Sequence, residues 1–226
     1  MSLRDRLQRR AIPRLVVSLS TVRWPGRAAA TLRRALGGHA RVDLHVAFDD
    51  PYSAVALLGL VDRLAGRRAQ LAVEPVVGRG IPDDPAVDAK RRYAVVDARR
   101  LARRQGLELS RSEPLEAEAT AFLARWAAVA PQGVRRTAFC AAAMRLLWFA
   151  SDGPVEPAPY AALWREHVGG EPPDGAAGLN GSDPRLRGRR LYDTPAAVVH
   201  GEWFFAHERL AQIEHRLDEL GWTVAA

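Results

Sequence analysis

The chain has 226 residues, 48% of them hydrophobic and 26% charged, and carries a formal net charge of +7. This composition is typical of a globular protein with one core, or of one domain with a sizeable insertion. No run of about 18 apolar residues is present, so no bilayer-spanning helix is expected. Pro13 and Arg14 interrupt the only short apolar cluster near the start, which makes a poor signal peptide. We therefore expect a cytoplasmic protein.

The positive charge is concentrated at the N-terminus. Residues 1–41 contain ten arginines and one acid, whereas the rest of the chain is nearly neutral. We define residues 1–40 as a basic N-terminal arm and predict one helix in it, Arg27–Leu36, ended by Gly37-Gly38. The arm could face nucleic acid, another polyanion or an anionic membrane surface. The alternative is a solvated arginine-rich helix, which the lack of interleaved aromatic residues favours.

Hydrophobic periodicity predicts the elements in chain order. Alternating apolar residues predict a strand over 41–48, helical spacing predicts a helix over 52–65, and a second strand, parallel to the first, follows over 69–77. Helices are then expected over 84–105, 113–129, 134–149 and 159–167, and a Gly- and Pro-rich loop over 169–181. A hairpin over 196–205 turns at His200-Gly201, and a closing helix spans 208–220.

This element order predicts an α/β protein with a thioredoxin-like sheet and an all-helical insertion. Residues 41–84 and 188–226 are expected to form the thioredoxin-like domain, with 85–187 as the helical insertion domain. We predict one four-stranded sheet. In thioredoxin-like proteins a Cys-x-x-Cys active site occupies the turn between the first strand and its helix. Here those four positions read Asp50-Pro51-Tyr52-Ser53, so both thiols are absent and dithiol oxidoreductase activity is not expected.

Three motifs make the resemblance sharper. The turn Phe-Asp-Asp-Pro-Tyr-Ser over 48–53 is similar to the Phe-x-Ser-Pro-Tyr-Ser turn of 2-hydroxychromene-2-carboxylate isomerases and kappa-class glutathione transferases, a branch of the DsbA-like family. Lys90 and Tyr93, with Asp97 and Arg100, resemble that family's Lys-x-x-Tyr-x-x-x-Asp-x-x-Arg helix. The third motif runs from Thr194-Pro195 to Leu210 and resembles the family's cis-proline strand followed by Gly-x-x-Phe-Phe-Gly-x-Asp-Arg-Leu.

The resemblance implies a glutathione site and a small apolar or aromatic substrate. Thr194, before an expected cis Pro195, would pair with the backbone of the tripeptide. His207 and Glu208, at the start of the last helix, would hold its γ-glutamyl end. Lys90, the only lysine in the chain, matches a family lysine that contacts the ligand, although a solvated helix residue is the equal alternative. Tyr52 would either contact the ligand or pack on its helix. A homodimer is a further open possibility.

The sequence departs from the family's pattern at positions that would take part in the family's thiol chemistry. Asp50 stands at the family's catalytic Ser, with Ser53 closing the turn. An ionised carboxylate cannot donate a hydrogen bond to a thiolate, and its charge would raise the pKa of a bound thiol. Asp50 could instead be a helix N-cap ahead of Pro51, or a general base if an apolar wall raised its pKa. The family's Gly is replaced by Ala206, and its Asn is not evident around Ile81–Asp83.

The other candidate residues are expected to pack in the core. Cys140 lies in an apolar helical stretch and is expected to be a buried small hydrophobe. The aromatic residues Trp126, Trp148, Phe149 and Trp164 are expected in the core of the insertion, although some could line an apolar substrate pocket. The six histidines show no metal-ligand spacing, so no metal is expected.

Two functions remain open: a glutathione-dependent isomerase or transferase, and a catalytically inactive thioredoxin-fold binding or scaffold module.

Overall fold

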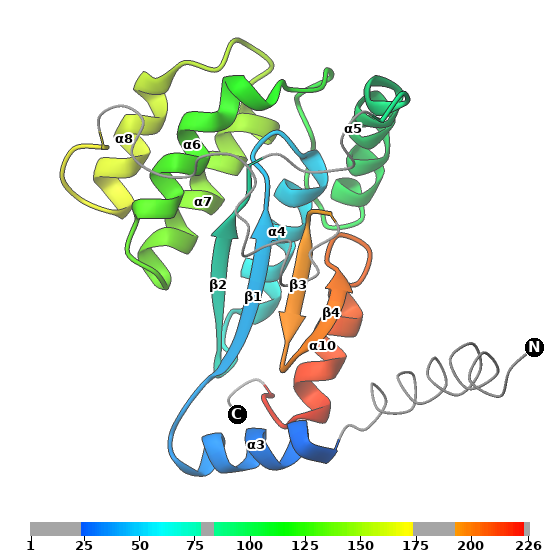
Figure 1. Ribbon diagram of the computed structural model, residues 1–226, viewed down its shortest axis with the longest axis vertical. Helices are drawn as coiled ribbons and strands as arrows, with labels where there is room; N and C mark the ends of the chain where they lie inside the picture. Colours follow the sequence, from blue (N-terminus) through cyan, green and yellow to red (C-terminus); the bar gives the residue numbers. More distant parts are fainter. Residues whose placement is uncertain (1–23, 78–83, 174–192, 224–226) are drawn as a thin grey trace, which may run out of the picture.

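The computed structural model describes residues 24–77, 84–173 and 193–223 (Figure 1). Several predictions fall outside these ranges. They are the first 23 residues of the basic arm, the segment Ile81–Asp83 and all but the start of the predicted loop over 169–181.

The centre of the molecule is a mixed four-stranded sheet. Its strands are β1 (Ala40–Val46), β2 (Ala69–Pro75), β3 (Ala196–Val199) and β4 (Glu202–Phe205), in the order β2-β1-β3-β4. β1 and β2 are parallel, whereas β3 is antiparallel to both β1 and β4. This arrangement confirms the predicted single sheet.

The hairpin turn lies where the sequence predicts it. His200 has φ 48° and Gly201 has φ 85°, so both residues of the two-residue loop are in the left-handed region. Two central residues with positive φ match the twist of the flanking antiparallel strands. The turn therefore fixes the register that pairs Val199 with Glu202.

Two helices cover one face of the sheet. α4 (Pro51–Leu64) connects β1 to β2, and α10 (Leu210–Glu219) follows β4 (Figure 1). The helices pack closely at Gly59, where an added Cβ would come within 2.7 Å of a Leu210 methyl carbon and 2.4 Å of the Gln105 amide oxygen. A glycine is thus needed in the middle of α4 to let α10 approach.

The helical block between β2 and β3 extends from one end of the sheet and along the β2 edge (Figure 1). It consists of α5 (Val87–Arg103), α6 (Ala117–Val129), α7 (Val134–Arg145), the π-helical turn η2 (Leu146–Ala150) and α8 (Pro157–His167). The aromatic side chains predicted for its core pack there: Trp126, Trp148 and Trp164 are buried, and Phe149 is half-buried against the core.

Several helix starts differ from the sequence-based boundaries. α5 begins at Val87 because the Asp84 side chain accepts a hydrogen bond from the Ala86 amide and forms a turn first. α6 begins at Ala117 rather than Glu113, since the backbone is still extended at Glu116. α8 begins at Pro157, two residues earlier than expected.

The start of α10 differs as well, and this difference bears on the site. The closing helix begins at Leu210 rather than Glu208, because the Glu208 and Arg209 amides donate to the carbonyls of Phe205 and Ala206 in a turn. The predicted helix over 134–149 also changes pitch, becoming π-helical from Leu146. Periodicity does not resolve such changes, since they depend on individual backbone hydrogen bonds.

The described part of the basic arm packs against the end of the chain. α3 spans Trp24–Ala35, its Ala30 is fully buried, and Arg34 donates to the Gly221 carbonyl and lies 5.8 Å from the centre of the Trp222 ring. Arg27 and Arg33 remain exposed, so polyanion binding by the arm stays a prediction. Within residues 24–77, 84–173 and 193–223, no helix combines the length and apolar character needed to cross a membrane.

One buried arginine joins three elements and was not predicted. Arg136 of α7 donates to the carbonyls of Ala128 and Ala130, where α6 ends, at 2.8–3.1 Å. Its second terminal nitrogen lies 3.4 Å from the Val73 carbonyl on β2 and 3.3 Å from a Glu74 carboxylate oxygen. The side chain therefore satisfies carbonyls that the helix end and the sheet edge leave open.

Candidate functional site

The turn between β1 and α4 is organised by Asp50. Its Oδ1 accepts a hydrogen bond from the Tyr52 amide and its Oδ2 accepts one from the Ser53 amide, both at 3.2 Å. Pro51 occupies the first helical position, where a missing N–H costs nothing. Of the roles left open for Asp50, that of helix N-cap is observed.

The cap is extended by two hydroxyl groups. Ser53 Oγ donates to Asp50 Oδ2 at 2.6 Å and accepts from the Ala47 amide at 3.1 Å. Thr194 Oγ1 lies 3.4 Å from the same carboxylate oxygen, at the start of a Thr194–Pro195 peptide bond that is cis, as predicted. The turn and the cis-proline segment, 144 residues apart in sequence, thus meet at one carboxylate.

This cluster faces inward. Asp50 and Ser53 have no exposed surface, and Thr194 is 6% exposed. The Asp50 carboxylate accepts from two amides and two hydroxyls, so its oxygens are directed at groups of the protein. A carboxylate held in this way cannot donate a hydrogen bond to a ligand, and no part of its surface is open to one.

Tyr52 links the turn to α5 and to the segment after β4. Its phenol donates to Asp97 Oδ2 at 3.1 Å, and its ring stacks on His207 with the ring centroids 4.3 Å apart. Burial, followed by the nearby Asp97 carboxylate, raises the pKa of the Tyr52 phenol, which therefore stays protonated. Tyr52 thus contacts α5 and the segment after β4 rather than packing only on its own helix, and ligand contact by Tyr52 stays a prediction.

Burial also lowers the pKa of His207 below its ordinary value, although the Glu208 and Asp97 carboxylates oppose the shift. His207 Nδ1 is buried and has no hydrogen-bond partner among the described residues. The imidazole is therefore neutral at neutral pH, and its ring stacks on the ring of Tyr52.

We expect the buried imidazole to make stability depend on pH. Because the pKa of His207 is lower in the folded state, the unfolded state binds more protons below the ordinary value of 6.5. The contribution of His207 is complete above that pH and is lost as the pH falls through the folded-state pKa. Urea unfolding of the parent and of His207→Phe, which keeps the ring stack, should show a shallower acid-side loss in the variant. If the free energy of unfolding fell equally steeply with decreasing pH in the parent and in the variant, this expectation would be contradicted.

The other predicted ligand contacts lie at the surface. Lys90 is near the start of α5, its side chain is 64% exposed, and its Nζ lies 2.5 Å from an Asp84 carboxylate oxygen. That hydrogen bond lowers the pKa of Asp84. Glu208 is 58% exposed and lies in the turn before α10, not in its first helical turn. Of the predicted residues, the structure brings Asp50, Ser53 and Thr194 into one cluster and Tyr52 and His207 into another.

Two residues near the turn were not assigned to it by sequence reasoning. Trp148 of η2 donates through Nε1 to the Phe48 carbonyl at 3.0 Å, just before the turn. Asp97 receives the Tyr52 phenol, and its place in the Lys-x-x-Tyr-x-x-x-Asp pattern was the available signal. Trp148 carried no signal beyond its apolar helix face. The helical block thus supports the turn directly.

The residues present do not fit the thiol end of glutathione. Position 50 offers no donor to a thiolate, and the Thr194 amide, expected to pair with the tripeptide, donates to the Asp193 side chain at 2.8 Å. The residues predicted for the γ-glutamyl end are not at a helix N-terminus. The cis-proline segment keeps the position beside the turn that the resemblance implies.

The single cysteine is inaccessible, and no metal site is found in the described part of the chain. Cys140 is fully buried in α7, as expected, and burial raises the pKa of its thiol to about 12. No group of three or more His, Cys, Asp or Glu side chains in residues 24–77, 84–173 and 193–223 is placed to hold a metal ion.

A mixed sheet of this order, a cis-proline beside the helix-capping turn and a helical block between β2 and β3 define a DsbA-like thioredoxin fold. Several solved structures are similar. A 2-hydroxychromene-2-carboxylate isomerase aligns with a TM-score of 0.59 and 15% identity, over 80% of this chain and 96% of the isomerase. A probable DsbA oxidoreductase from Streptomyces coelicolor aligns with a TM-score of 0.60 and 16% identity, over 83% and 93%. No protein-family model and no curated protein sequence matches the chain.

Proposed function

We propose that this protein is a thioredoxin-fold binding module that does not activate thiols. The observation that supports it is the state of Asp50, which has no exposed surface and whose carboxylate accepts from Tyr52, Ser53 and Thr194. In a thiol-activating site this position must donate a hydrogen bond or provide the sulfur itself. Asp50 instead holds the turn together.

Electrostatics supports the same proposal. A bound thiol near the turn would lie close to a buried carboxylate, and like charge disfavours the thiolate. Its pKa would be held at or above the ordinary value of about 8.5. A thiol-dependent reaction at neutral pH needs the opposite shift.

The experiment is a pH titration of glutathione, followed by the ultraviolet absorbance of its thiolate, with and without an excess of the protein. The parent is expected to leave the midpoint unchanged or to raise it. Asp50→Ser keeps a helix-capping side chain and provides a hydroxyl, so it is the matched variant for restoring a donor. Calorimetric titration of both proteins reports whether glutathione binds at all. A parent that lowers the midpoint would overturn the proposal.

A second candidate is glutathione-dependent isomerisation or transfer on a small apolar or aromatic compound. It is favoured by the fold likeness to an enzyme described as a 2-hydroxychromene-2-carboxylate isomerase, together with the cis Thr194–Pro195 segment beside the turn. In this case the parent should bind glutathione and convert 2-hydroxychromene-2-carboxylate in its presence. Binding without turnover would leave the binding module as the better account.

A further inference from the structure

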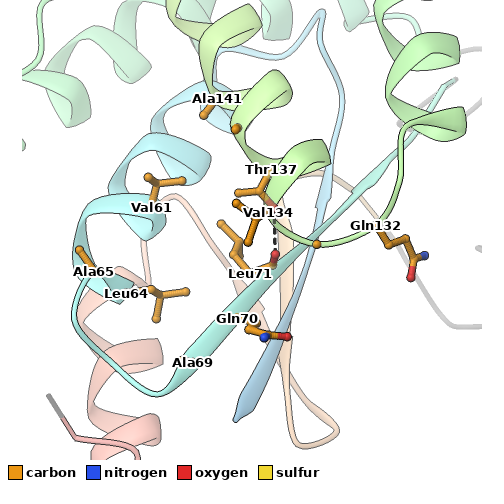
Figure 2. Close-up of a pocket in the computed structure, with 12 residues that line it drawn as sticks. Val61, Leu64, Ala65, Ala69, Gln70, Leu71, Gln132, Val134, Thr137 and Ala141 are labelled. Atoms are coloured by element: carbon orange, nitrogen blue, oxygen red, sulfur yellow. Dashed lines mark hydrogen bonds between the residues drawn. The ribbon is translucent and has the colours of Figure 1, made fainter. Parts of the chain in front are cut away.

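A groove lies at the other end of α4 from the turn. It is enclosed by the last turns of α4, by β2 and by the first half of α7, and has a volume of about 670 Å³ (Figure 2). Asp50 precedes α4, whereas Val61, Leu64 and Ala65 belong to its end. With about 1.5 Å of rise per residue, the two ends are about 20 Å apart. The groove is therefore separate from the site described above.

The lining is apolar and uncharged. Val61 and Leu64 of α4 face Leu71 of β2 and Val134 of α7 across the groove (Figure 2). The twelve lining residues include no charged side chain, although 26% of the chain is charged; their polar groups are two glutamines and a threonine. Apolar walls with a few uncharged polar groups, in a volume between about 300 and 1,000 Å³, are typical of small-molecule sites.

Hydrogen bonds along the β2 edge argue against a peptide strand as the occupant. β2 is an edge strand of the sheet, and a strand that paired with it would need its outward carbonyls. The Leu71 carbonyl already accepts from Thr137 Oγ1 at 2.9 Å (Figure 2). The Val73 carbonyl lies 3.4 Å from an Arg136 nitrogen. α7 thus closes this edge to strand addition while leaving the hollow beside it open.

We propose that the groove between α4, β2 and α7 binds a small, uncharged, apolar molecule. The absence of charge from the lining selects against ionic ligands, because a charged group would lose its hydration without a partner. Val134, which is 81% exposed, forms part of the open side, while Leu64 and Leu71 form the buried floor. Gln70 supplies an amide for one polar group on the ligand, whereas the Gln132 amide donates to the Glu74 carboxylate. The inference does not depend on the function proposed for the turn.

The test uses the full chain and the uncharged fluorescent probe N-phenyl-1-naphthylamine. We expect saturable binding of one probe per chain, with an affinity that does not change with salt because no charge pairs form. Ala138→Trp fills the groove from α7 and Val134→Asp places a charge at its open side. Each should weaken binding by about tenfold or more, which corresponds to about 1.4 kcal/mol. Ala119→Trp, on the exposed side of α6, is the matched control and should bind the probe like the parent.

The two groove variants, Ala138→Trp and Val134→Asp, differ in how much they risk the fold. Val134 is largely exposed, so Val134→Asp is expected to fold even if Ala138→Trp does not. The proposal would be overturned if the parent did not bind the probe. It would also be overturned if Val134→Asp bound the probe with the same affinity as the parent. So would a parent dimer in sedimentation that Val134→Asp dissociates, since the occupant would then be a second copy of the chain.

Discussion

Replacing Arg136 by methionine is expected to lower the free energy of unfolding by about 3 kcal/mol. The substitution keeps an apolar stem of similar length but removes every donor that the guanidinium provides to Ala128, Ala130 and Val73. These carbonyls lie at the end of α6 and on the edge of β2, where no regular backbone partner exists. A buried acceptor left without a donor costs about 1–3 kcal/mol. Glu74 adds less, because it is partly exposed and also receives Gln132.

Urea unfolding at neutral pH measures the effect. Arg135→Met is the matched control, since its side chain is exposed and has one long hydrogen bond, to the Val168 carbonyl at 3.4 Å. The control should change stability by less than about 0.5 kcal/mol. Arg136→Lys keeps the charge but not the planar arrangement of donors, so we expect an intermediate loss. Equal stabilities of the two methionine variants would show that the Arg136 hydrogen bonds contribute nothing net.

The fold could be predicted from the sequence because its signals are repeated along each element. The alternation in β1 and the helical spacing in α4 each rest on several apolar residues, so one exception does not hide the pattern. The hairpin was placed correctly because its His-Gly turn lies between two short apolar runs. Such signals survive even where no protein family model matches the chain.

Features set by a single hydrogen bond could not be predicted in the same way. The start of α10 at Leu210 depends on where the Glu208 and Arg209 amides donate, and this moved His207 and Glu208 off the expected helix N-terminus. In a chain with 32 arginines and a single lysine among its 33 basic residues, nothing in the sequence distinguishes the buried Arg136 from its exposed neighbour Arg135.

The candidate site contains features of both kinds, some that the sequence predicts and some that it does not. The sequence offered the helix cap as one open role of Asp50, its family resemblance predicted the cis bond at Pro195, and both features are observed. It left the direction of the Asp50 carboxylate open, because that direction depends on Thr194, which is distant in sequence. The contact between Thr194 Oγ1 and Asp50 Oδ2 exists only once the hairpin has packed beside the turn.

Replacing Asp50 by alanine is expected to lower the free energy of unfolding by about 2–4 kcal/mol. Loss of a capping side chain costs about 0.5–2 kcal/mol by itself. Here the Ser53 hydroxyl also loses its acceptor inside a fully buried cluster, which adds a desolvation cost. Asp50→Ser should lose less, since serine still caps the helix. Asp88→Ala, an exposed acid in the first turn of α5, is the control and should stay within about 0.5 kcal/mol of the parent.

A double-mutant cycle distinguishes a simple cap from the inward-facing cluster. If Asp50 acted only through the backbone amides of α4, the costs of Asp50→Ala and Ser53→Ala would add. The 2.6 Å hydrogen bond between the two side chains predicts otherwise. Once Asp50 is alanine, the Ser53 hydroxyl has lost its carboxylate partner, so removing it should cost about 1 kcal/mol less than in the parent. Additive costs in urea unfolding would mean that the carboxylate is not held by Ser53, and would leave it available to a ligand.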